Sequence, residues 1–569
     1  MKARLLLFAL LASAAILFPA PGAFLLPGLA LALLHDDRHP IVTGVLLSMA
    51  IWPVAFQVLY WIHVPLRPLT SGVLVASSAI VAWKIRKVEP RWDSTAILGT
   101  AALFRLLPAV LYPCASGRDM SLHTLIVRRI LEEGHVPADL MPIDSESVWG
   151  IPIGFHFEAA ALGLEANSAS LWLSVAVYVA VTLALYRALV PFFPSGISAL
   201  AAVAVSFLAD KPQTVVRYGS TPLVLSFVLI VAALALWVEG MRGRLRPIPI
   251  ALLAAASVVT HPTPPYGAIW IVVPALLIFA WRRFDRARIG ATALALGLCV
   301  ATIVPYVLGV RRRPVPEEMR TWTREYQKRG NSRITEPTGI RAAVGVVAHA
   351  RHEMGEAFVW LSVLVLAYGT WRRRPLAALY GAFFLCWAAV ALNVRVWAMP
   401  LSLLLYPDRV MHFLILPPAF LLASALEEGE KYFAGRPLRP WALAATLCAV
   451  AGFGGYRAGV RYLGTYGKNA YVTRSDLEAF AWMKREIPQD AVIANLEDDA
   501  GMWIPALAHR RITSPHGIPT YYLPDTQPLP RYVYVGRRTR VRDPAGILGR
   551  KARFERIFER DGAEVWALR

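Results

Sequence analysis

Asp119 lies seven residues beyond the apolar run 95–112 and precedes a segment with helical spacing of its apolar residues. This segment, 121–133, ends at Gly134 and predicts a short amphipathic helix lying at a membrane surface. His123 lies four residues after Asp119, so the two side chains share a helix face. A carboxylate in this place can act as general base on a hydroxyl, with the imidazole orienting it. The alternatives are that Asp119 only caps the helix and that His123 is a structural histidine.

Two further histidines stand at turns rich in proline and glycine. The spacing Pro152-x-Gly154-x-His156 predicts a constrained turn before an apolar run, and His261 lies between Thr260 and Pro262 at the end of another run. Both side chains are candidates for substrate contact near the membrane interface. A turn followed by a helix start explains each pattern equally well.

Arginines at the ends of apolar runs are candidates for binding a phosphate. The planar guanidinium can hold two phosphate oxygens at once, and a charge at membrane depth is costly unless it is used or paired. Tyr406 and Arg409 precede a strongly apolar run, and Arg395 ends the run before it. The other interpretation of Arg409 is a snorkelling side chain that pairs with Asp408.

Apolar runs near the length of a bilayer crossing recur along almost the whole chain, and they must position these residues. The chain has 569 residues, of which 56% are hydrophobic and only 17% charged. About 13 to 15 spans are expected, which excludes a soluble enzyme, a disordered chain and a disulfide-stapled secreted domain. Much of the net charge of +21 lies in short loops, so it indicates membrane topology and no nucleic-acid partner.

These short basic loops alternate along the chain with longer segments. The alternation places the loops 113–168 and 311–356 and the tail on the opposite, outward side of the membrane. The loop 113–168 is acidic, with eight carboxylates against three arginines. The loop 311–356 fits a mobile cover over a site or a solvated surface helix. We therefore expect an all-α polytopic plasma (inner) membrane protein with a small extracytoplasmic α/β domain, whose short apolar runs predict strands at 491–494, 531–535 and 563–568. The expected divisions are an N-terminal transmembrane extension 1–94, a catalytic transmembrane module 95–460 and a soluble domain 461–569.

The outward loop resembles the first loop of GT-C glycosyltransferases in the run Gly117-Arg118-Asp119, His123 and the Pro152-x-Gly154-x-His156 turn. These are multi-span enzymes that take sugars from polyprenyl-phosphate carriers. Tyr218-Gly219-Ser220-Thr221-Pro222, Thr260-His261-Pro262 and the tail segments around Trp482 and Trp503 are also similar to segments of this class. The resemblance covers roughly residues 95–569 and implies a GT-C-like helical bundle.

The resemblance implies that Asp119 would be the base or a metal ligand and that transfer would invert the anomeric carbon. Arg409 and Arg395, the candidates from the residues themselves, would then hold the donor phosphate. The acceptor would be a hydroxyl of an outward-facing glycan, lipid or protein. Many members of the class carry a paired acid, whereas Met120 follows Asp119 here, so a divalent metal is left open. The alternative from another class is a transporter or a flippase for lipid-linked glycans.

Overall fold

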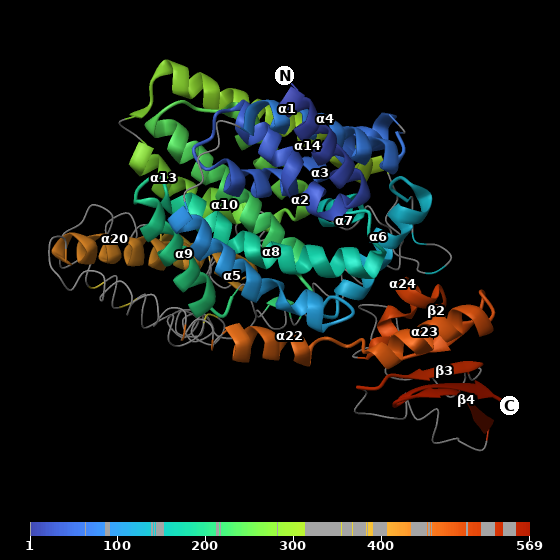
Figure 1. Cartoon of the computed structure of the whole chain (residues 1–569). Coiled ribbons are helices and arrows are strands. Elements are labelled where there is room, and N and C mark those ends of the chain that lie inside the picture. The colour runs from blue at the N-terminus through green and yellow to red at the C-terminus, as the bar shows by residue number, and fades with distance from the viewer. Residues whose placement is uncertain are drawn as a thin grey trace.

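A computed structural model shows a helical bundle with a small mixed sheet at one corner (Figure 1). The structure describes residues 2–569 outside a set of gaps. These gaps are 63, 86–91, 138–139, 141–142, 144–152, 212–214, 217, 281–282, 313–406 (where 354, 363, 367, 383 and 385–390 are described), 434–457 (where 452 and 456 are described), 497–498, 514–529 and 539–552.

Seven of the described helices are long and apolar enough to cross a membrane. They lie in α3 (Pro40–Ile62), α4 (Leu66–Lys84), α5 (Trp92–Leu111), α8 (Ala166–Leu189), α10 (Thr221–Arg242), α14 (Arg286–Arg312) and α20 (Leu416–Phe433) with the turn before it. Shorter apolar helices join them: α1 (Lys2–Leu17), α2 (Pro19–Leu34), α9 (Ser195–Leu208), α11 (Pro247–Thr260), α12 (Thr263–Ile271) and α13 (Val273–Ala280). The expected multi-pass membrane protein is thereby confirmed.

Burial separates helices that are alike in apolar composition. In α10, 89% of the most apolar window is buried inside the protein, against 11% in α14, although their mean hydropathies are 2.5 and 2.1. A helix that is apolar all round can be surrounded by other helices or by lipid tails. α10 is therefore a central helix of the bundle, and α14 presents most of its surface to lipid.

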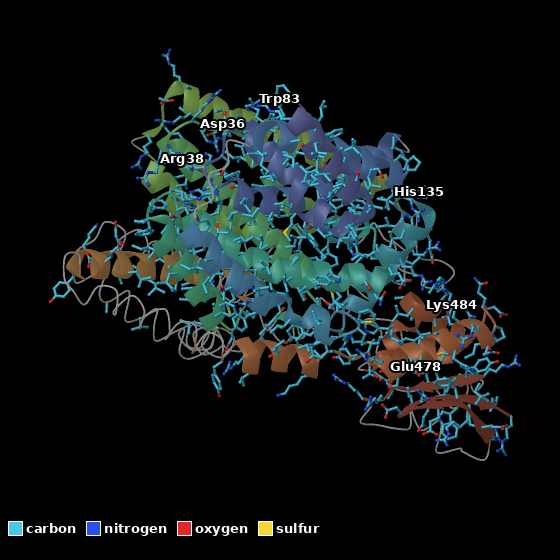
Figure 2. All side chains as sticks on the ribbon, in the orientation of Figure 1. Asp36, Arg38, Trp83, His135, Glu478 and Lys484 are labelled. Carbon is cyan, nitrogen blue, oxygen red and sulfur yellow. The ribbon has the colours of Figure 1, made fainter. Side chains whose placement is uncertain are left out.

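Short elements join the spans at the end of the bundle that holds the candidate residues. They are α6 (Met120–Glu133), α7 (Gly154–Ala161), α19 (Pro407–Val410), the 3-10 turn Met411–Ile415, the π-helical turn Ala458–Leu463 and α22 (Gly464–Lys468). The expected helix 121–133 is confirmed, and Gly134 ends it with a φ of +71°. Figure 2 shows His135, just beyond α6, at one end of the bundle and Asp36 and Arg38 near the other.

The tail forms a five-stranded sheet in the order β2-β1-β3-β5-β4. Its strands are β1 (Val492–Ala494), β2 (Arg511–Ile512), β3 (Tyr532–Val535), β4 (Phe554–Arg560) and β5 (Ala563–Leu568). β1 runs parallel to β2 and β3, whereas β5 pairs antiparallel with β3 and β4. The helices α23 (Arg474–Glu486) and α24 (Ile504–Ala508) and the 3-10 turn Ala500–Trp503 complete it, and Thr473 and Asp476 form a capping box at the start of α23. The expected small α/β tail is confirmed.

The N-terminal helices are part of the same bundle. Trp52 donates a hydrogen bond from Nε1 to the carbonyl of Ala23, and the rings of Phe56 and Phe157 stack with centroids 4.9 Å apart. The boundaries 1–94, 95–460 and 461–569 remain predictions. The spans expected at 357–371, 375–393 and 440–457 lie almost wholly outside the described residues.

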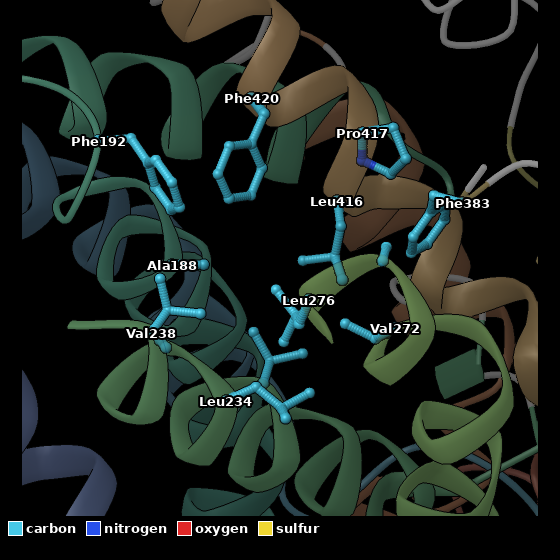
Figure 3. Close-up of a pocket in the computed structure, with 13 residues that line it drawn as sticks. Ala188, Phe192, Leu234, Val238, Val272, Leu276, Phe383, Leu416, Pro417 and Phe420 are labelled. Atoms are coloured by element: carbon cyan, nitrogen blue, oxygen red, sulfur yellow. The ribbon is translucent and has the colours of Figure 1, made fainter. Parts of the chain in front are cut away.

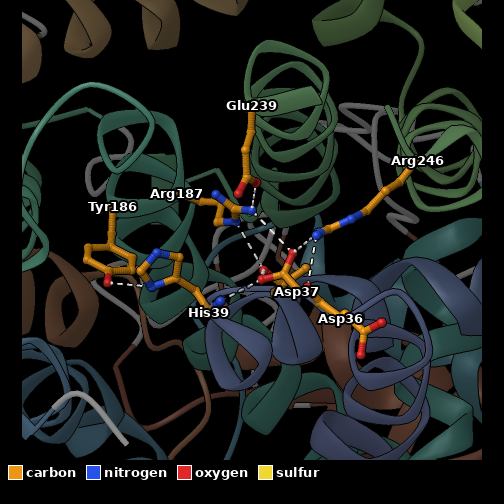
Figure 4. Close-up of polar contacts among 8 residues, drawn as sticks. Asp36, Asp37, His39, Tyr186, Arg187, Glu239 and Arg246 are labelled. Carbon is orange, nitrogen blue, oxygen red and sulfur yellow. Dashed lines mark hydrogen bonds and ion pairs between the residues drawn. The ribbon is translucent and has the colours of Figure 1, made fainter. Parts of the chain in front are cut away.

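A buried ion-pair network ties together the end of the bundle that lies opposite α6 (Figure 4). Arg187, at the end of α8, contacts Asp37 and Glu239, and Arg246 donates to Asp37 at 2.9 Å. Burial alone would raise the pKa of Asp37, but Arg187, the His39 N–H and Arg246 together hold it below its usual value. α8 has 24 residues and so spans about 36 Å between this network and α7.

Candidate functional site

Asp119 lies in a backbone turn that other parts of the chain hold in place. Its N–H donates to the carbonyl of Tyr218 at 2.9 Å, and the N–H of Gly117 donates to the carbonyl of Asn469 at 3.0 Å. Asp119 occupies the capping position of α6 and is half-buried, yet its carboxylate makes no capping hydrogen bond. Side-chain capping therefore does not account for an acid at this position.

Two glycines allow the loops to cross at this point. Gly117 has a φ of +102° and Gly219 a φ of +78°, a region that side-chain-bearing residues rarely adopt. A Cβ on Gly117 would lie only 2.2 Å from the amide nitrogen of Gly219. The Tyr218-Gly219 segment therefore serves to bring the start of α10 against the turn that carries Asp119.

His123 is joined to the buried His156. Nδ1 of His123 lies 2.9 Å from Nε2 of His156, and the ring centroids are 5.0 Å apart. Burial lowers the pKa of His156 to about 3, so this ring is neutral at pH 7. A neutral ring with one fixed hydrogen bond sets the tautomer and orientation of its partner. His156 thus contributes to the candidate site by orienting His123. Direct contact of His156 with substrate remains a prediction.

Helix α7 also carries Glu158, two residues after His156. Gly154 lies directly against Thr260, since a Cβ there would be 2.9 Å from the Thr260 Cα, and Glu158 follows one turn later on the same face of α7. Glu158 is buried, and both its carboxyl oxygens have no hydrogen-bond partner among the described residues. Burial raises its pKa well above the usual value, so the group is held as the neutral acid.

His261 and Arg409 lie together on a neighbouring part of the same end. Nδ1 of His261 accepts from the Thr263 N–H at 3.3 Å, and its carbonyl accepts from the Ser226 hydroxyl at 2.7 Å. Burial and then the positive charge of Arg409 lower the pKa of His261 to about 3. The structure thus brings Arg409 to one of the histidines that the sequence singled out.

The tail domain docks on α6, the helix that follows Asp119. Arg128 donates to the carbonyl of Ala506, and Nε2 of His509 lies 3.6 Å from Oε1 of Glu132. Ser116 also donates from its hydroxyl to the carbonyl of Tyr466 at 3.0 Å. The tail therefore contacts both the turn before Asp119 and the helix after it.

Several predicted features lie outside the described residues: Arg395, Tyr406 and nearly all of the loop 311–356. Within the described part of the chain, no three residues of the types His, Cys, Asp and Glu come together to hold a metal ion.

One buried cation was not predicted from the sequence. Arg105 in α5 donates from Nη2 to the carbonyl of Ser206 at 2.5 Å and stacks on the rings of Phe207 and Tyr462. Its Nε and Nη1 have no hydrogen-bond partner among the described residues. The signal available in the sequence was a single arginine inside an apolar run.

The fold and site define a polytopic membrane protein whose candidate site residues lie at one end of the helical bundle, beside a small α/β domain. A family model matches residues 21–538, and the chain belongs to this family, which is described as a family of unknown function (DUF6541). No curated protein matches the sequence.

One solved structure with a similar fold is the oligosaccharyltransferase of Archaeoglobus fulgidus, tethered through a disulfide bond to an acceptor peptide containing the NVT sequon. The sequences are 12% identical and the TM-score is 0.44, over 75% of this chain and 64% of that one. The chain thus spans less than two thirds of that protein's length. The chemistry of the site itself therefore carries the functional proposal.

Proposed function

We propose that this protein is a membrane glycosyltransferase that moves a sugar from a polyprenyl-phosphate donor to a hydroxyl of a glycan, lipid or protein acceptor. The observation that carries the proposal is the half-buried Asp119, held on a fixed turn at the head of α6 beside the hydrogen-bonded His123–His156 pair. A carboxylate fixed beside an oriented imidazole is suited to taking a proton from a hydroxyl.

In the proposed reaction, Asp119 accepts the proton of the acceptor hydroxyl as its oxygen bonds to the anomeric carbon. The bond between that carbon and the phosphate oxygen breaks, and the polyprenyl phosphate leaves with the electron pair. Attack from the face opposite the leaving group inverts the anomeric carbon. Arg409, with Arg395, offsets the negative charge that develops on the phosphate.

His123 and His156 orient the acid. His156 stays neutral, and its Nε2 forms a hydrogen bond with Nδ1 of His123. Nε2 of His123 then faces the side of α6 that it shares with Asp119. His261 and Tyr406 are proposed to contact the donor beside Arg409. The tail, the loop 311–356 and this end of the bundle face the periplasm or exterior, where a lipid-linked sugar supplies the activated donor.

The test is transfer of sugar from a panel of polyprenyl-phosphate sugars by purified protein in membranes. Asp119→Asn removes the base but preserves size, so we expect a loss of about 100-fold or more with unchanged thermal unfolding. Asp490→Asn, an exposed acid in the tail, is the matched control and should retain full activity. Full activity in Asp119→Asn contradicts the assigned role of Asp119.

Native mass spectrometry separates the donor site from the chemistry. Arg409→Gln should lose bound polyprenyl phosphate, whereas Asp119→Asn should retain it. The second candidate function is transport of a lipid-linked glycan, which the incompletely bonded cation Arg105 inside a span favours. Binding of the lipid-linked sugar without turnover, and loss of its translocation in Arg105→Met, would replace the first proposal by the second.

A further inference from the structure

An apolar groove opens among α8, α10, α13 and α20 (Figure 3). It contains a cavity of about 80 Å³, lined by apolar side chains of α8, α10, α13 and α20 with Phe383. One water-sized group needs about 10–15 Å³, and a cavity without polar partners does not hold ordered water. The groove therefore suits a hydrocarbon chain. Its position along α10 indicates which leaflet of the bilayer supplies that chain.

The groove lies near the end of α10 that carries arginine. The α10 residues that line it run from Val231 to Val238, which are 10 and 17 residues after Thr221, or about 15 and 26 Å along the helix from the end near Asp119. The hydrocarbon core of a bilayer is about 30 Å thick. A chain in the groove therefore belongs to the leaflet at the arginine-rich end, because an acyl chain from the other leaflet ends near the midplane.

An arginine stands at the mouth of the groove. Leu234, Val238 and Arg242 follow one another at intervals of four residues and so lie on one face of α10. The guanidinium of Arg242 lies 5.4 Å from the ring centroid of Phe192, which itself lines the groove. Arg242 is exposed and makes no ion pair with any described residue, because the nearby Glu239 is paired with Arg187.

We infer that this groove binds an anionic phospholipid, with part of one acyl chain in the apolar groove and the phosphate on Arg242. The guanidinium supplies paired donors for phosphate oxygens, and the cytoplasmic leaflet, to which arginine-rich loops point, is rich in anionic lipid. The lipid fills the space between α10, α13 and α20 and so joins three helices that would otherwise enclose a void. The inference is independent of glycosyl transfer.

The first test compares lipid retention by native mass spectrometry after reconstitution in vesicles of phosphatidylglycerol and phosphatidylcholine. The wild-type protein should retain phosphatidylglycerol, and Arg242→Gln should retain about tenfold less, since one charge-assisted contact is lost. Arg244→Gln is the matched control, because Arg244 is exposed in the same loop and does not lie on the groove face. Equal retention by Arg242→Gln and wild type overturns the phosphate assignment.

A second variant tests the groove separately from the charge. Ala275 is 5% exposed and lines the groove, so Ala275→Phe should block the acyl chain and lower retention, whereas Ala293→Phe on the exposed face of α14 should not. The Ala275→Phe and Ala293→Phe variants should unfold at similar temperatures, because the Phe side chain at position 275 fills existing space. If added polyprenyl phosphate displaces the bound phospholipid, the groove holds the tail of that carrier and the inference is wrong.

Discussion

The titratable residues of helix α7 respond to burial in opposite directions. His156 is neutral because its pKa is lowered to about 3, and Glu158 is neutral because its pKa is raised. The stabilisation linked to His156 is present above the unfolded pKa of about 6.5 and is lost as the pH falls towards 3. That linked to Glu158 is present below about pH 4.5 and is lost as the pH rises. Each residue therefore limits the stable pH range from one side.

Replacement of His156 by Gln should make the free energy of unfolding depend less on pH in acid solution. The amide cannot gain a proton on unfolding, so the unfolding free energy of the variant should fall less steeply between pH 6 and 4, by about 1.4 kcal/mol per pH unit. Unfolding followed by tryptophan fluorescence at several pH values measures this slope. Parallel slopes for the variant and wild type would mean that His156 is already protonated in the folded protein.

Close backbone packing between short helices and span ends sets the geometry of the site. Gly154 places the start of α7 on the end of α11, and Gly117 meets Gly219 where the α6 turn crosses the start of α10. Neither contact involves side-chain chemistry, but together they bring Asp119, His123 and His156 to one end of the bundle. The tail domain then covers α6 through Arg128.

Replacement of Gly154 by Ala should displace α7 from α11, because the added Cβ would meet the Thr260 backbone at 2.9 Å. We expect a loss of about 1–3 kcal/mol in unfolding free energy, together with lower transferase activity as His156 moves. Gly99→Ala is the control: it lies in α5 with nothing within 4 Å of its Cβ, and should be stabilising by up to about 1 kcal/mol. Equal stability of the two variants would show that α7 adjusts freely.

Across the whole molecule, two polar assemblies occupy opposite ends of an apolar bundle. At the end that carries Asp119, both carboxyl oxygens of Glu158 lack a hydrogen-bond partner among the described residues, whereas the charges around Arg187 form ion pairs and only Nη1 of Arg187 lacks a partner there. Buried ion pairs fix the relative positions of helices, and incompletely bonded carboxyl groups are typical of sites that meet a ligand. The bundle thus has an ion-paired end and, opposite it, the end that carries the candidate site.

Removing one partner of the network around Arg187 should cost more stability than removing two. Arg187→Met leaves the buried Asp37 with Arg246 alone and removes the ion-pair partner of the half-buried Glu239, so we expect a loss of about 3–5 kcal/mol in the free energy of unfolding. Adding Asp37→Asn should recover part of this loss, as a double-mutant cycle of unfolding free energies will measure. An additive result would show that the two side chains do not interact.

The sequence was sufficient to predict the membrane class, most described spans, the helix 121–133 and the strands expected at 491–494, 531–535 and 563–568, which form at 492–494, 532–535 and 563–568. These elements follow from local patterns: apolar runs of bilayer length, a helical stripe ended by glycine, and short β-branched runs between turns. The strands β2 and β4 were missed, because β2 has two residues and β4 is largely polar and exposed.

The pairing of His123 with His156, the buried neutral Glu158 and the partners of Arg187 could be found only in the tertiary structure. Each joins residues tens to more than a hundred positions apart, or depends on which face of a helix is covered, and no local pattern encodes either property. The apolar composition of the chain by itself determined that these helices enter a membrane. Since α10 and α14 are similarly apolar, only the packing of the bundle decided which faces protein, which faces lipid, and which polar side chains meet.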